Sequence, residues 1–502
     1  MTAPLARAAH RLRGLLEPLG IEADERPIHG VAVDSRAVRP GYLFMAVQGT
    51  LHHGGEFAAE ALSQGAAAIL WQPTPGFDDQ ALSARCAKQA VPCIAVHSLH
   101  AQVGIIAARF YGDPGANMTV IGVTGTDGKT SVSQFIAHAL GRKEYRCGIL
   151  GTLGCGLPGH LRRVTSLTTP DPITLQCELN QLRARHAQAV VIEVSSHALD
   201  QQRLAGVGFD VAVLTNLSRD HLDYHPSQAA YAQAKALLFQ RPELHTVVVN
   251  VDDDFGRSLR ASVRHARVIG YSLAGIETAQ LRCLRLAAQS DGLRLLLDAG
   301  GCRAAVRVGL LGRFNAANVL AALGALLALD VPLREALQRL SLLQPVSGRM
   351  ERYGSEGRPT VVIDYAHTPA GLQAALAAMR EHFAGRIWCV FGCGGDRDRG
   401  KRPLMGALAR ASADRIIITN DNPRTENPRR IIAEIQAGAG ADSRVRVIED
   451  RREAVIHSIR AAAPEDAILV AGKGHEEYQL IGTRQLPYSD RETVKQALGG
   501  GH

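Results

Sequence analysis

The 502-residue sequence is poor in aromatic side chains and has no long apolar run. Aromatic residues make up 5%, and the formal net charge of +8 is spread along the chain rather than gathered in a basic run interleaved with aromatics, which argues against a nucleic-acid partner. No stretch approaches the roughly 20 apolar residues that a bilayer span needs, and the amphipathic N-terminus, residues 1–20, lacks a secretory core. We therefore expect a cytoplasmic protein without membrane insertion, whose mild basic excess suits small polyanionic substrates.

The nine cysteines include no CxxC pair. Cys389 and Cys393 are four positions apart, but no cluster of histidines or further cysteines accompanies them, so we expect reduced thiols rather than a zinc site or a disulfide framework. Hydrophobic residues make up 46% and charged residues 21%, as in ordinary globular proteins. The length exceeds what one core supports and predicts two to four domains.

A phosphate-binding loop is the most informative feature of the sequence. An apolar run over residues 119–123 enters the glycine-rich turn TGTDGKT, and a helical pattern over residues 131–140 follows it. In such a loop the backbone N–H groups and the helix N-terminus face anionic oxygens, the lysine contacts the terminal phosphates and the following hydroxyl is placed for Mg²⁺. We therefore predict that the chain binds a nucleoside triphosphate through Gly125, Thr126, Asp127, Gly128, Lys129, Thr130 and Ser131.

Strands alternate with helices along most of the chain, which predicts an α/β fold with mostly parallel sheets. Residues 269–308 look more like antiparallel strands, residues 314–329 form a long Ala/Leu helix, and residues 344–348 resemble a linker. The other strands are predicted at residues 31–36, 41–47, 66–71, 91–96, 120–123, 189–194, 211–215, 246–250, 361–364, 387–391, 416–419 and 467–471.

The last four of these strands each open into a charged or glycine-rich loop, with the sequences DYAHTP, GCGGDRD, NDNPR and GKGHE. In open parallel sheets, ligands bind where the carboxyl ends of the strands lead into loops. The sequence therefore predicts a second ligand site in the C-terminal part of the chain.

Three features of the central region are candidates for metal chemistry. Glu193 ends a buried strand, where a carboxylate in a phosphate-loop domain serves the metal or forms a structural ion pair. Lys235 lies among Ala and Leu in a predicted helix, and either extends to solvent or is a functional buried lysine. A polar cluster follows the strand at residues 211–215, and the residues alone do not decide which of its members bind a metal: Asp220, His221, Asp223 and His225.

Nine motifs occur in a fixed order between residues 33 and 492: TGTDGKTS, IEVSSHALDQQR, TNLSRDHLDYH, GRFNAANVLAAL, SGRME, DYAHTP, GCGGDRDRGKRPLM, DNPRTENP and GKGHEEYQ. Together they resemble the Mur ligases of peptidoglycan synthesis, and among these the members that add diaminopimelate. The resemblance implies a monomeric, ATP- and Mg²⁺-dependent ligase that joins meso-2,6-diaminopimelate to UDP-N-acetylmuramoyl-L-alanyl-D-glutamate through an acyl phosphate. It also implies three domains: residues 1–98 for the UDP moiety, residues 99–346 for ATP, and a Rossmann-like domain at residues 347–502 for the amino acid.

The resemblance also assigns roles to individual residues. Thr130 and Glu193 would hold one Mg²⁺, His221 would join Glu193 at a second, and Lys235 would be carbamylated (N6-carboxylysine) and, with Lys129, complete the catalytic set. The residues implied on the ATP side are Asn315, Asn318, Arg349 and Asp364. Those implied for the UDP-linked substrate are Val33, Ser35, Thr168, Thr169, Ser195, Gln201 and Arg203. Those implied for the amino acid are Arg397, Asp421, Asn422, Pro423, Arg424, Gly472 and Glu476.

Arg424 distinguishes between candidate amino acids. Diaminopimelate differs from lysine by one distal carboxylate, which a guanidinium can hold by two parallel hydrogen bonds while Glu476 meets the ammonium group. The competing hypotheses are a lysine-adding ligase, a folylpolyglutamate synthase and, in a different class, a phosphate-loop switch or nucleic-acid motor. Arg424 and the N-terminal motif at residues 34–36 argue against the first two, and the four charged loops argue against the third. Asp127 departs from the family, which commonly has Asn there, and adds a negative charge beside the phosphates.

Overall fold

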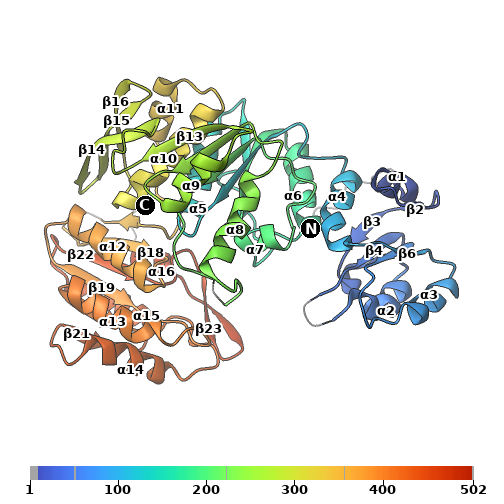
Figure 1. Cartoon of the computed structure of the whole chain (residues 1–502). Coiled ribbons are helices and arrows are strands. Elements are labelled where there is room, and N and C mark those ends of the chain that lie inside the picture. Colours follow the sequence, from blue (N-terminus) through green and yellow to red (C-terminus); the bar gives the residue numbers. More distant parts are fainter. Residues whose placement is uncertain (1–9, 50–51, 222, 355–356, 500–502) are drawn as a thin grey trace. The chain divides into compact units, whose positions relative to one another are not determined.

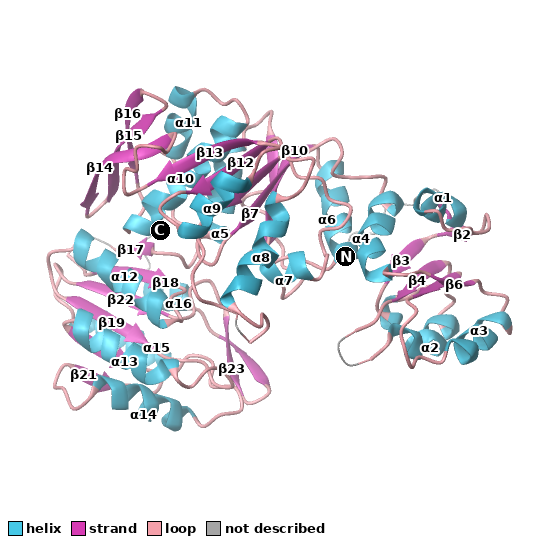
Figure 2. Ribbon diagram, in the orientation of Figure 1, coloured by secondary structure: helices cyan, strands magenta, loops and turns pink. Residues whose placement is uncertain are grey.

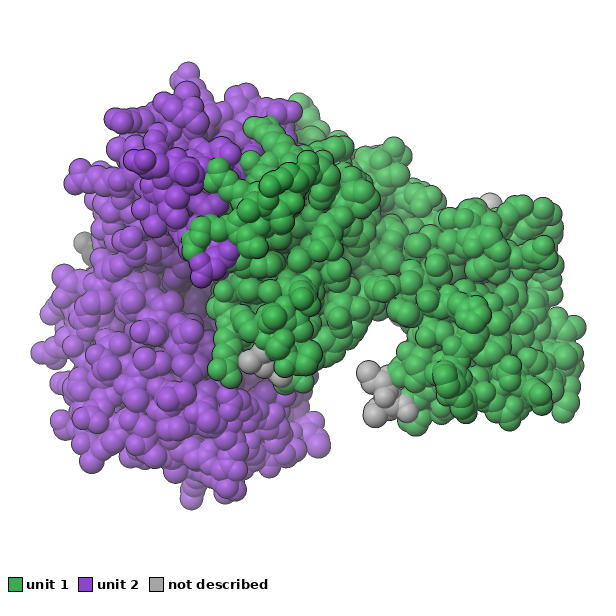
Figure 3. Space-filling model, viewed as in Figure 1, with its two compact units in different colours: residues 1–133, 140–249, 255–268 green, residues 134–139, 250–254, 269–502 purple. Residues whose placement is uncertain are grey.

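The computed structural model describes residues 10–49, 52–221, 223–354 and 357–499, and the chain folds into alternating helices and strands (Figures 1 and 2). Unit 1 comprises residues 1–133, 140–249 and 255–268, and unit 2 comprises residues 134–139, 250–254 and 269–502 (Figure 3). The domain boundaries near residues 98 and 346 remain predictions. Across the described ranges, none of the helices is both long enough and apolar enough to cross a bilayer.

The N-terminal part of unit 1 is a four-stranded parallel sheet with a helix layer on each face. Leu43 and Met45 on one strand belong to one hydrophobic core, and Phe44 between them belongs to the other, as the period-two alternation of a strand requires. In sheet order the strands are β3 (Gly30–Ala32), β4 (Tyr42–Ala46), β5 (Ala68–Trp71) and β6 (Cys93–Ala95). The helices are α1 (Leu12–Leu16) and α4 (Leu99–Phe110) in the first core, and α2 (Ala58–Ser63) and α3 (Asp79–Ala87) in the second.

The strands predicted in this region are confirmed, although β3 ends at Ala32, earlier than expected. The helix predicted within residues 1–20 is observed as the short α1, and residues 1–9 lie outside the described residues. A two-residue pair, β1 (His10–Arg11) with β2 (Pro27–Ile28), and helix α3 were not predicted.

The central part of unit 1 is a parallel sheet whose strands are buried on both faces. Its order is β12 (Thr246–Asn250), β11 (Val211–Leu214), β7 (Thr119–Thr124), β10 (Ala187–Glu193) and β8 (Arg146–Gly151), with β9 (Gly154–Gly156) antiparallel at the edge. Four of these strands are confirmed predictions, and β8 and β9 were not predicted. The helices of this region are α5 (Lys129–Leu140), α6 (Pro172–Ala184), α7 (Ser196–Asp200), α8 (Gln228–Phe239) and α9 (Asp254–Ser262). The carboxyl ends of β7, β10 and β11 therefore meet at one edge.

Unit 2 begins with the strands predicted to be antiparallel. They are β13 (Arg267–Ser272), β14 (Leu281–Gln289), β15 (Gly292–Ala299) and β16 (Cys302–Val308). The last three pair antiparallel as predicted, but β13 and β14 pair parallel, because the connection over residues 273–280 is not a tight hairpin turn. The long helix predicted at residues 314–329 is α10 (Arg313–Ala328), and α11 (Leu333–Leu340) follows it.

The C-terminal sheet has helices on both faces. Val361 and Ile363 share a core with two helices, whereas Val362 between them shares a core with three others on the opposite face. The strand order is β17 (Glu351–Tyr353), β18 (Thr360–Asp364), β22 (Ala467–Ala471), β19 (Ile387–Phe391), β20 (Arg415–Ile418) and β21 (Val445–Val447), and only β17 is antiparallel to its neighbour. One face carries α12 (Pro369–His382), α13 (Lys401–Ser412) and α14 (Pro428–Ala439), and the other carries α15 (Arg451–Ala461) and α16 (Asp490–Ala497).

All four strands predicted in this region are confirmed, and they are parallel to one another. Their carboxyl ends bring the four charged loops to one edge of the sheet, as the sequence predicted. A hairpin of β23 (Tyr478–Ile481) and β24 (Arg484–Pro487), which was not predicted, follows the last of these loops.

Candidate active site

The predicted phosphate-binding loop lies between β7 and α5. Lys129 Nζ donates to the carbonyl oxygens of Gly125 (2.8 Å) and Thr126 (2.9 Å), so its ammonium group lies over the loop. Gly125 has a φ of 148°, and a Cβ there would come within 1.8 Å of Thr215 Oγ1, so no larger residue fits. Asp127 is exposed, which keeps the extra negative charge in solvent. A glycine-rich turn that leads into a helix N-terminus with a lysine above it is an anion site.

Glu193 lies next to this loop at the end of β10 and is fully buried. Its Oε2 accepts hydrogen bonds from Thr130 Oγ1 and Thr152 Oγ1, both at 2.9 Å, and its Oε1 accepts from the N–H of Thr152 at 3.1 Å. Burial raises the pKa of the Glu193 carboxyl, whereas the threonine hydroxyls and the Lys129 charge act in the opposite direction. A buried carboxylate beside hydroxyl oxygens is a donor set that suits a hard cation such as Mg²⁺.

The described residues contain no group of three or more His, Cys, Asp or Glu side chains that could hold a metal ion by themselves. Mg²⁺ in nucleotide sites is bound by one or two protein oxygens, and phosphate and water complete its shell.

Lys235, on α8, is 1% exposed, so the hypothesis that it extends to solvent is wrong. Its Nζ donates to the Gly125 carbonyl oxygen at 2.7 Å and lies 4.5 Å from the centroid of the Tyr231 ring. Lys129 donates to the same carbonyl oxygen, so the two amino groups are neighbours. Burial, followed by the positive charge of Lys129, lowers the pKa of Lys235 well below its ordinary value. Both effects favour the neutral amine of Lys235 over the charged form.

His221 lies in an aromatic cluster beyond β11. Its ring centroid is 4.9 Å from that of His197, and its Nε2 is 3.5 Å from an oxygen of Asp220. Burial lowers the pKa of His221, which favours the neutral imidazole that binds metals. His225 is buried and its ring contacts Ser196 Oγ at 3.0 Å, which ties it to α7. Residue 222 of this motif lies outside the described residues, and the shared metal of Glu193 and His221 remains a prediction.

Five of the residues predicted for the UDP-linked substrate form one hydrogen-bonded group in unit 1. Thr169 Oγ1 accepts from the N–H of Ser195 at 3.0 Å, and Arg203 donates to the Thr169 carbonyl oxygen at 3.1 Å. Arg203 also donates to Gln201 Oε1 at 2.9 Å. Thr168 Oγ1 lies 3.2 Å from Thr152 Oγ1, the hydroxyl that donates to Glu193 Oε2. The group therefore adjoins the phosphate-loop residues.

Val33 and Ser35 lie in the N-terminal sheet region, just after β3. Val33 is half-buried against a hydrophobic core, and Ser35 is buried and donates through Oγ to Glu60. Within the described residues, the Ser35 side chain forms no hydrogen bond with Thr168, Thr169, Ser195, Gln201 or Arg203. The role of Val33 and Ser35 at the uridine moiety remains a prediction.

The residues predicted for ATP outside the phosphate loop all belong to unit 2. Asn318 Nδ2 donates to Asn315 Oδ1 at 3.0 Å, and both side chains are buried on α10. Arg349 stacks on Tyr365, with the guanidinium carbon 4.6 Å from the ring centroid. Asp364 accepts two backbone N–H groups at 2.8 Å, while burial raises its pKa. Ordered amides and a stacked arginine of this kind are suited to a nucleotide base and its sugar.

Residues predicted to bind the amino-acid substrate lie at the carboxyl ends of β20 and β22. Asn422 Nδ2 donates to Glu476 Oε2 at 2.9 Å. Lys473, fully buried, donates to the same oxygen at 2.8 Å and to Asn422 Oδ1 at 3.0 Å. Arg424 NH1 donates to the carbonyl oxygen of Gly395 at 2.8 Å. The loop that follows β19 and the loop that follows β20 thus both take part in the site.

The other residues predicted to bind the amino-acid substrate differ in burial. Asp421 is buried, and its carboxylate accepts from the N–H of Asn422 at 2.7 Å. Gly472 packs so closely that an added Cβ would lie 2.6 Å from Asp421 Oδ2. Pro423 is buried, whereas Arg397 is exposed and donates to the carbonyl oxygen of its own neighbour, Asp396.

Three residues at these sites were not predicted: Thr152, Tyr231 and Lys473. Lys473 lies two residues after a predicted buried strand, within the GKGHE motif, and its place at a strand's carboxyl end could have identified it. Thr152 and Tyr231 carry no such signal, because they gain their roles from contacts with distant residues.

A parallel sheet that leads into a lysine-bearing glycine loop, beside a buried Thr130–Glu193 pair, defines a nucleotide-binding domain of the phosphate-loop class. Residues 27–111 match the family model described as "Mur ligase family, catalytic domain", residues 123–326 match "Mur ligase middle domain", and residues 348–474 match "Mur ligase, glutamate ligase domain". The chain belongs to the Mur ligase family.

Individual proteins similar to this chain have a more specific name than that of the family. The chain is 53% identical over 494 residues to the UDP-N-acetylmuramoyl-L-alanyl-D-glutamate–2,6-diaminopimelate ligase of Alkalilimnicola ehrlichii, covering 97% of this chain and 99% of that protein. It is 48% identical to the Pseudomonas aeruginosa protein of the same name, covering 94% and 95%. A solved structure of a protein of this name aligns with a TM-score of 0.73 and 34% identity, covering 98% and 99%. The predicted family and the three-domain α/β fold are therefore confirmed.

Proposed function

We propose that this chain is an ATP-dependent amide ligase of peptidoglycan precursor synthesis. It joins meso-2,6-diaminopimelate to the D-glutamate of UDP-N-acetylmuramoyl-L-alanyl-D-glutamate. The observation that carries the proposal is that one chain holds both a phosphate-binding loop with its Thr130–Glu193 pair and an amino-acid pocket with Arg424 and Glu476. The similarity to named diaminopimelate ligases over nearly the whole chain supports the same substrates.

In the first step, an oxygen of the D-glutamate γ-carboxylate attacks the γ-phosphorus of ATP, and ADP leaves. The product is an acyl phosphate, which gives the unreactive carboxylate a leaving group. Lys129, which lies over the loop, neutralises charge that builds up on the transferring phosphoryl group. Arg203 and the hydroxyls of Thr168 and Thr169 hold the UDP-linked substrate beside the loop.

Mg²⁺, held by Thr130 and Glu193 and at a second position by Glu193 and His221, would screen the phosphate oxygens from the incoming carboxylate. Lys235 takes up CO₂ as a neutral amine: its nitrogen bonds to the carbon, a proton is released, and the neutral amine becomes an anionic carbamate. Burial and the neighbouring Lys129 support this role, because both favour the neutral amine that the reaction needs.

In the second step, the amino group of diaminopimelate attacks the carbonyl carbon of the acyl phosphate. Phosphate leaves, a proton is released and an amide forms. Glu476 meets the ammonium group at the far end of the amino acid, and Arg424 holds the carboxylate there. Among the described residues, NH1 is the only guanidinium nitrogen of Arg424 that has a hydrogen-bond acceptor, so NH2 and Nε are available for this two-point contact.

The enzyme works as a monomer in the cytoplasm, where ATP and UDP-linked precursors are present. The proposal is tested by phosphate release from ATP in the presence of each substrate singly and of both together, with mass analysis of the product. We expect phosphate release that requires both substrates and equals the amide formed. ATP hydrolysis that needs neither substrate would instead indicate a phosphate-loop switch or motor, and a product formed from lysine in preference would indicate the lysine-adding ligase.

A further inference from the structure

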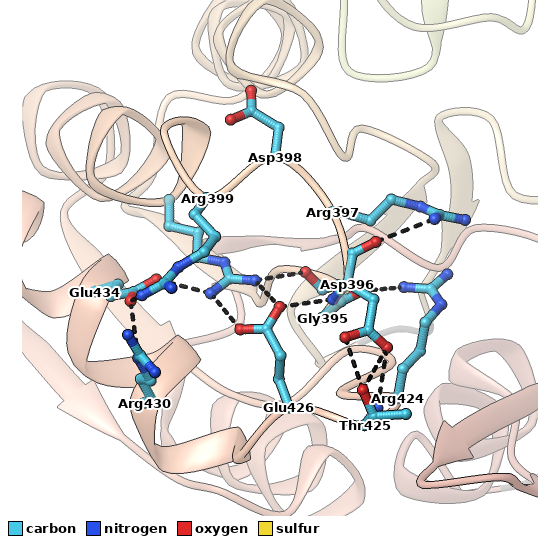
Figure 4. A network of polar contacts seen from close by, with 12 residues as sticks. Gly395, Asp396, Arg397, Asp398, Arg399, Arg424, Thr425, Glu426, Arg430 and Glu434 are labelled. Atoms are coloured by element: carbon cyan, nitrogen blue, oxygen red, sulfur yellow. Dashed lines mark hydrogen bonds and ion pairs between the residues drawn. The ribbon is translucent and has the colours of Figure 1, made fainter. Parts of the chain in front are cut away.

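A network of polar contacts joins two loops that carry residues predicted for the amino-acid site (Figure 4). The first, the 394–400 loop, connects β19 with α13, and the second, the 421–427 loop, connects β20 with α14 and carries Arg424. Apart from Arg424, none of the side chains that join the two loops was predicted to take part in the reaction.

Arg402, on α13, is the centre of the network and is fully buried. Its NH2 and NH1 donate to the two oxygens of Glu426 at 2.8 and 2.9 Å, and NH1 also donates to Glu434 Oε2 at 2.7 Å. These hydrogen bonds lower the pKa of Glu426 to about 2, so its carboxylate is charged at neutral pH. A buried arginine that has lost its water depends on both carboxylates, and the removal of either one destabilises the protein.

Glu426 also connects the two loops. Its Oε1 accepts a hydrogen bond from the N–H of Asp396 at 2.6 Å, and the Asp396 carboxylate accepts from Thr425 Oγ1 at 2.8 and 2.9 Å. The N–H of Thr425 donates to the same carboxylate at 3.1 Å. A closed circuit thus runs from Glu426 to Asp396 to Thr425, and Thr425 is the residue that follows Arg424.

The backbone is in the left-handed region at Asp396, within this circuit, and at Arg424, which directly precedes Thr425. Asp396 has a φ of 52° and Arg424 a φ of 50°, a conformation that costs free energy for residues other than glycine and persists only where the surroundings fix it. The loops also touch directly, since a Cβ on Gly395 would lie 1.9 Å from the carbonyl oxygen of Pro423. Arg424 NH1 then donates to Gly395 across this contact.

The circuit therefore fixes the backbone on either side of the contact between Arg424 NH1 and Gly395. A guanidinium binds a carboxylate by two parallel hydrogen bonds only if its plane is set to within a fraction of an ångström and a few tens of degrees. A residue that fixes this plane strengthens the binding of a ligand that carries the distal carboxylate. It does not strengthen the binding of a ligand that lacks this carboxylate.

We propose that Glu426 is a positioning residue for substrate selection: through Asp396 and Thr425 it orients Arg424 toward the distal carboxylate of diaminopimelate. The inference rests on the proposed function and adds to it the residues that fix the specificity-determining arginine. Glu426 itself does not touch the substrate.

Glu434 provides a matched control. It accepts from the same NH1 of Arg402 and forms ion pairs with Arg399 and Arg430, but it contacts neither Asp396 nor Thr425. Glu426→Gln and Glu434→Gln therefore both weaken the Arg402 site, whereas only the first disturbs the circuit to Arg424. Thr425→Val removes the hydroxyl at the far end of the circuit, and Thr425→Ser retains it.

The experiment compares the four variants with wild type for KM of diaminopimelate, KM of ATP, kcat and thermal unfolding. For Glu426→Gln and Thr425→Val we expect roughly a 10- to 100-fold rise in KM for diaminopimelate, with KM for ATP and the rate with saturating lysine little changed. Glu434→Gln should unfold at a lowered temperature similar to that of Glu426→Gln but keep the wild-type KM for diaminopimelate, and Thr425→Ser should resemble wild type.

The inference is overturned if Glu426→Gln and Glu434→Gln change the KM for diaminopimelate equally, or if Thr425→Val leaves it unchanged. If Glu426→Gln does not fold, the pair of Thr425 variants decides the question, since their side chain is at the exposed end of the circuit. Failure of the proposed function is recognised separately, because wild type itself would then not use diaminopimelate.

Discussion

Lys129 and Lys235 both donate to one carbonyl oxygen, that of Gly125. Two ammonium groups this close repel each other, and Lys235 is almost fully buried, so burial and the Lys129 charge both lower the pKa of Lys235. Glu193 is equally buried, but two hydroxyl groups donate hydrogen bonds to its carboxylate, which suits a carboxylate that binds a cation. At the residue scale, the chemistry of the site therefore depends on whether each buried charge has neighbouring groups that stabilise it.

Lys129→Ala and Glu193→Ala should each lower kcat by at least about 100-fold, because both side chains act where charge builds up on the transferring phosphoryl group. The fold should persist, as judged by circular dichroism. Asp127→Asn is the matched control in the same loop: its carboxylate is exposed, so the variant should retain nearly wild-type kcat. Near-normal turnover by either alanine variant would show that the assigned ATP site is wrong.

Lys235→Ala should be nearly inactive, and short carboxylates such as acetate should restore part of the activity by occupying the place of the carbamate. The pH dependence has a definite sign. Because burial lowers the pKa of Lys235, the share of neutral amine at a given pH is larger than for an ordinary lysine, and this share falls on acidification. A ¹³CO₂-derived carbamate signal should therefore appear in wild type at neutral pH, decline toward acid and be absent in Lys235→Met. An active, ligand-bound enzyme with an unmodified lysine would contradict this role.

Arg424→Ala should lower kcat/KM for diaminopimelate by roughly 30- to 1,000-fold, which corresponds to about 2–4 kcal/mol for a charged two-point contact that is partly desolvated. KM for ATP and for the UDP-linked substrate should change little, and lysine, which has no distal carboxylate, should lose little activity. Steady-state kinetics with each amino acid measures this directly. A variant that uses diaminopimelate as well as wild type does would exclude Arg424 as the specificity residue.

At the scale of elements, strands with continuous apolar runs were predictable because they are buried on both faces, as in Val190 to Ile192 and Ile416 to Ile418. The short or polar strands β9, β21, β23 and β24 were not, because their pairing depends on partners rather than on composition. The parallel pairing of β13 with β14 was also missed, since the sequence indicates strands but not the course of the connection between them.

The candidate site was predictable where a motif lies at the carboxyl end of a strand, as at Lys129, Glu193 and Arg424. Buried charged residues that act through distant partners were not predictable. Arg402 meets Glu426 and Arg451 meets Asp490 only in the folded chain, and nothing in their local sequence marks them as buried. Pairs of this kind need tertiary structure to be recognised.

Arg451 and Asp490 connect α15 with the start of α16, and both side chains are fully buried. Arg451 donates to the two oxygens of Asp490 at 2.9 and 2.8 Å, and Tyr488 OH donates to Oδ1 at 2.7 Å. Asp490→Ala leaves a buried arginine without its anion and should cost about 3–5 kcal/mol of stability.

Urea or thermal unfolding measures this cost. The control is Lys495→Ala, which removes an ion pair with Glu492 whose side chains are 49% and 59% exposed and should change the stability by less than about 1 kcal/mol. Equal effects of the two variants would show that the buried pair contributes no more than a surface pair.

For the whole molecule, the three regions that match the family models each hold candidate residues for a different part of the reaction. Val33 and Ser35 lie in the first region, the phosphate loop and Lys235 in the second, and Arg424 in the third, with Glu476 two residues beyond its end. ATP turnover in such an enzyme should depend on both other substrates, since the acyl phosphate forms on one and is consumed by the other. The amino acid is the substrate that distinguishes this chain from its nearest functional alternative.

A competition between diaminopimelate and lysine therefore tests the central claim most directly. Purified enzyme is given ATP, Mg²⁺, UDP-N-acetylmuramoyl-L-alanyl-D-glutamate and equal concentrations of the two amino acids, and the nucleotide-linked products are weighed by mass spectrometry. The account predicts that the diaminopimelate product predominates by at least about 30-fold, the lower bound for one charged two-point contact. Equal incorporation of the two amino acids, or a preference for lysine, would contradict it.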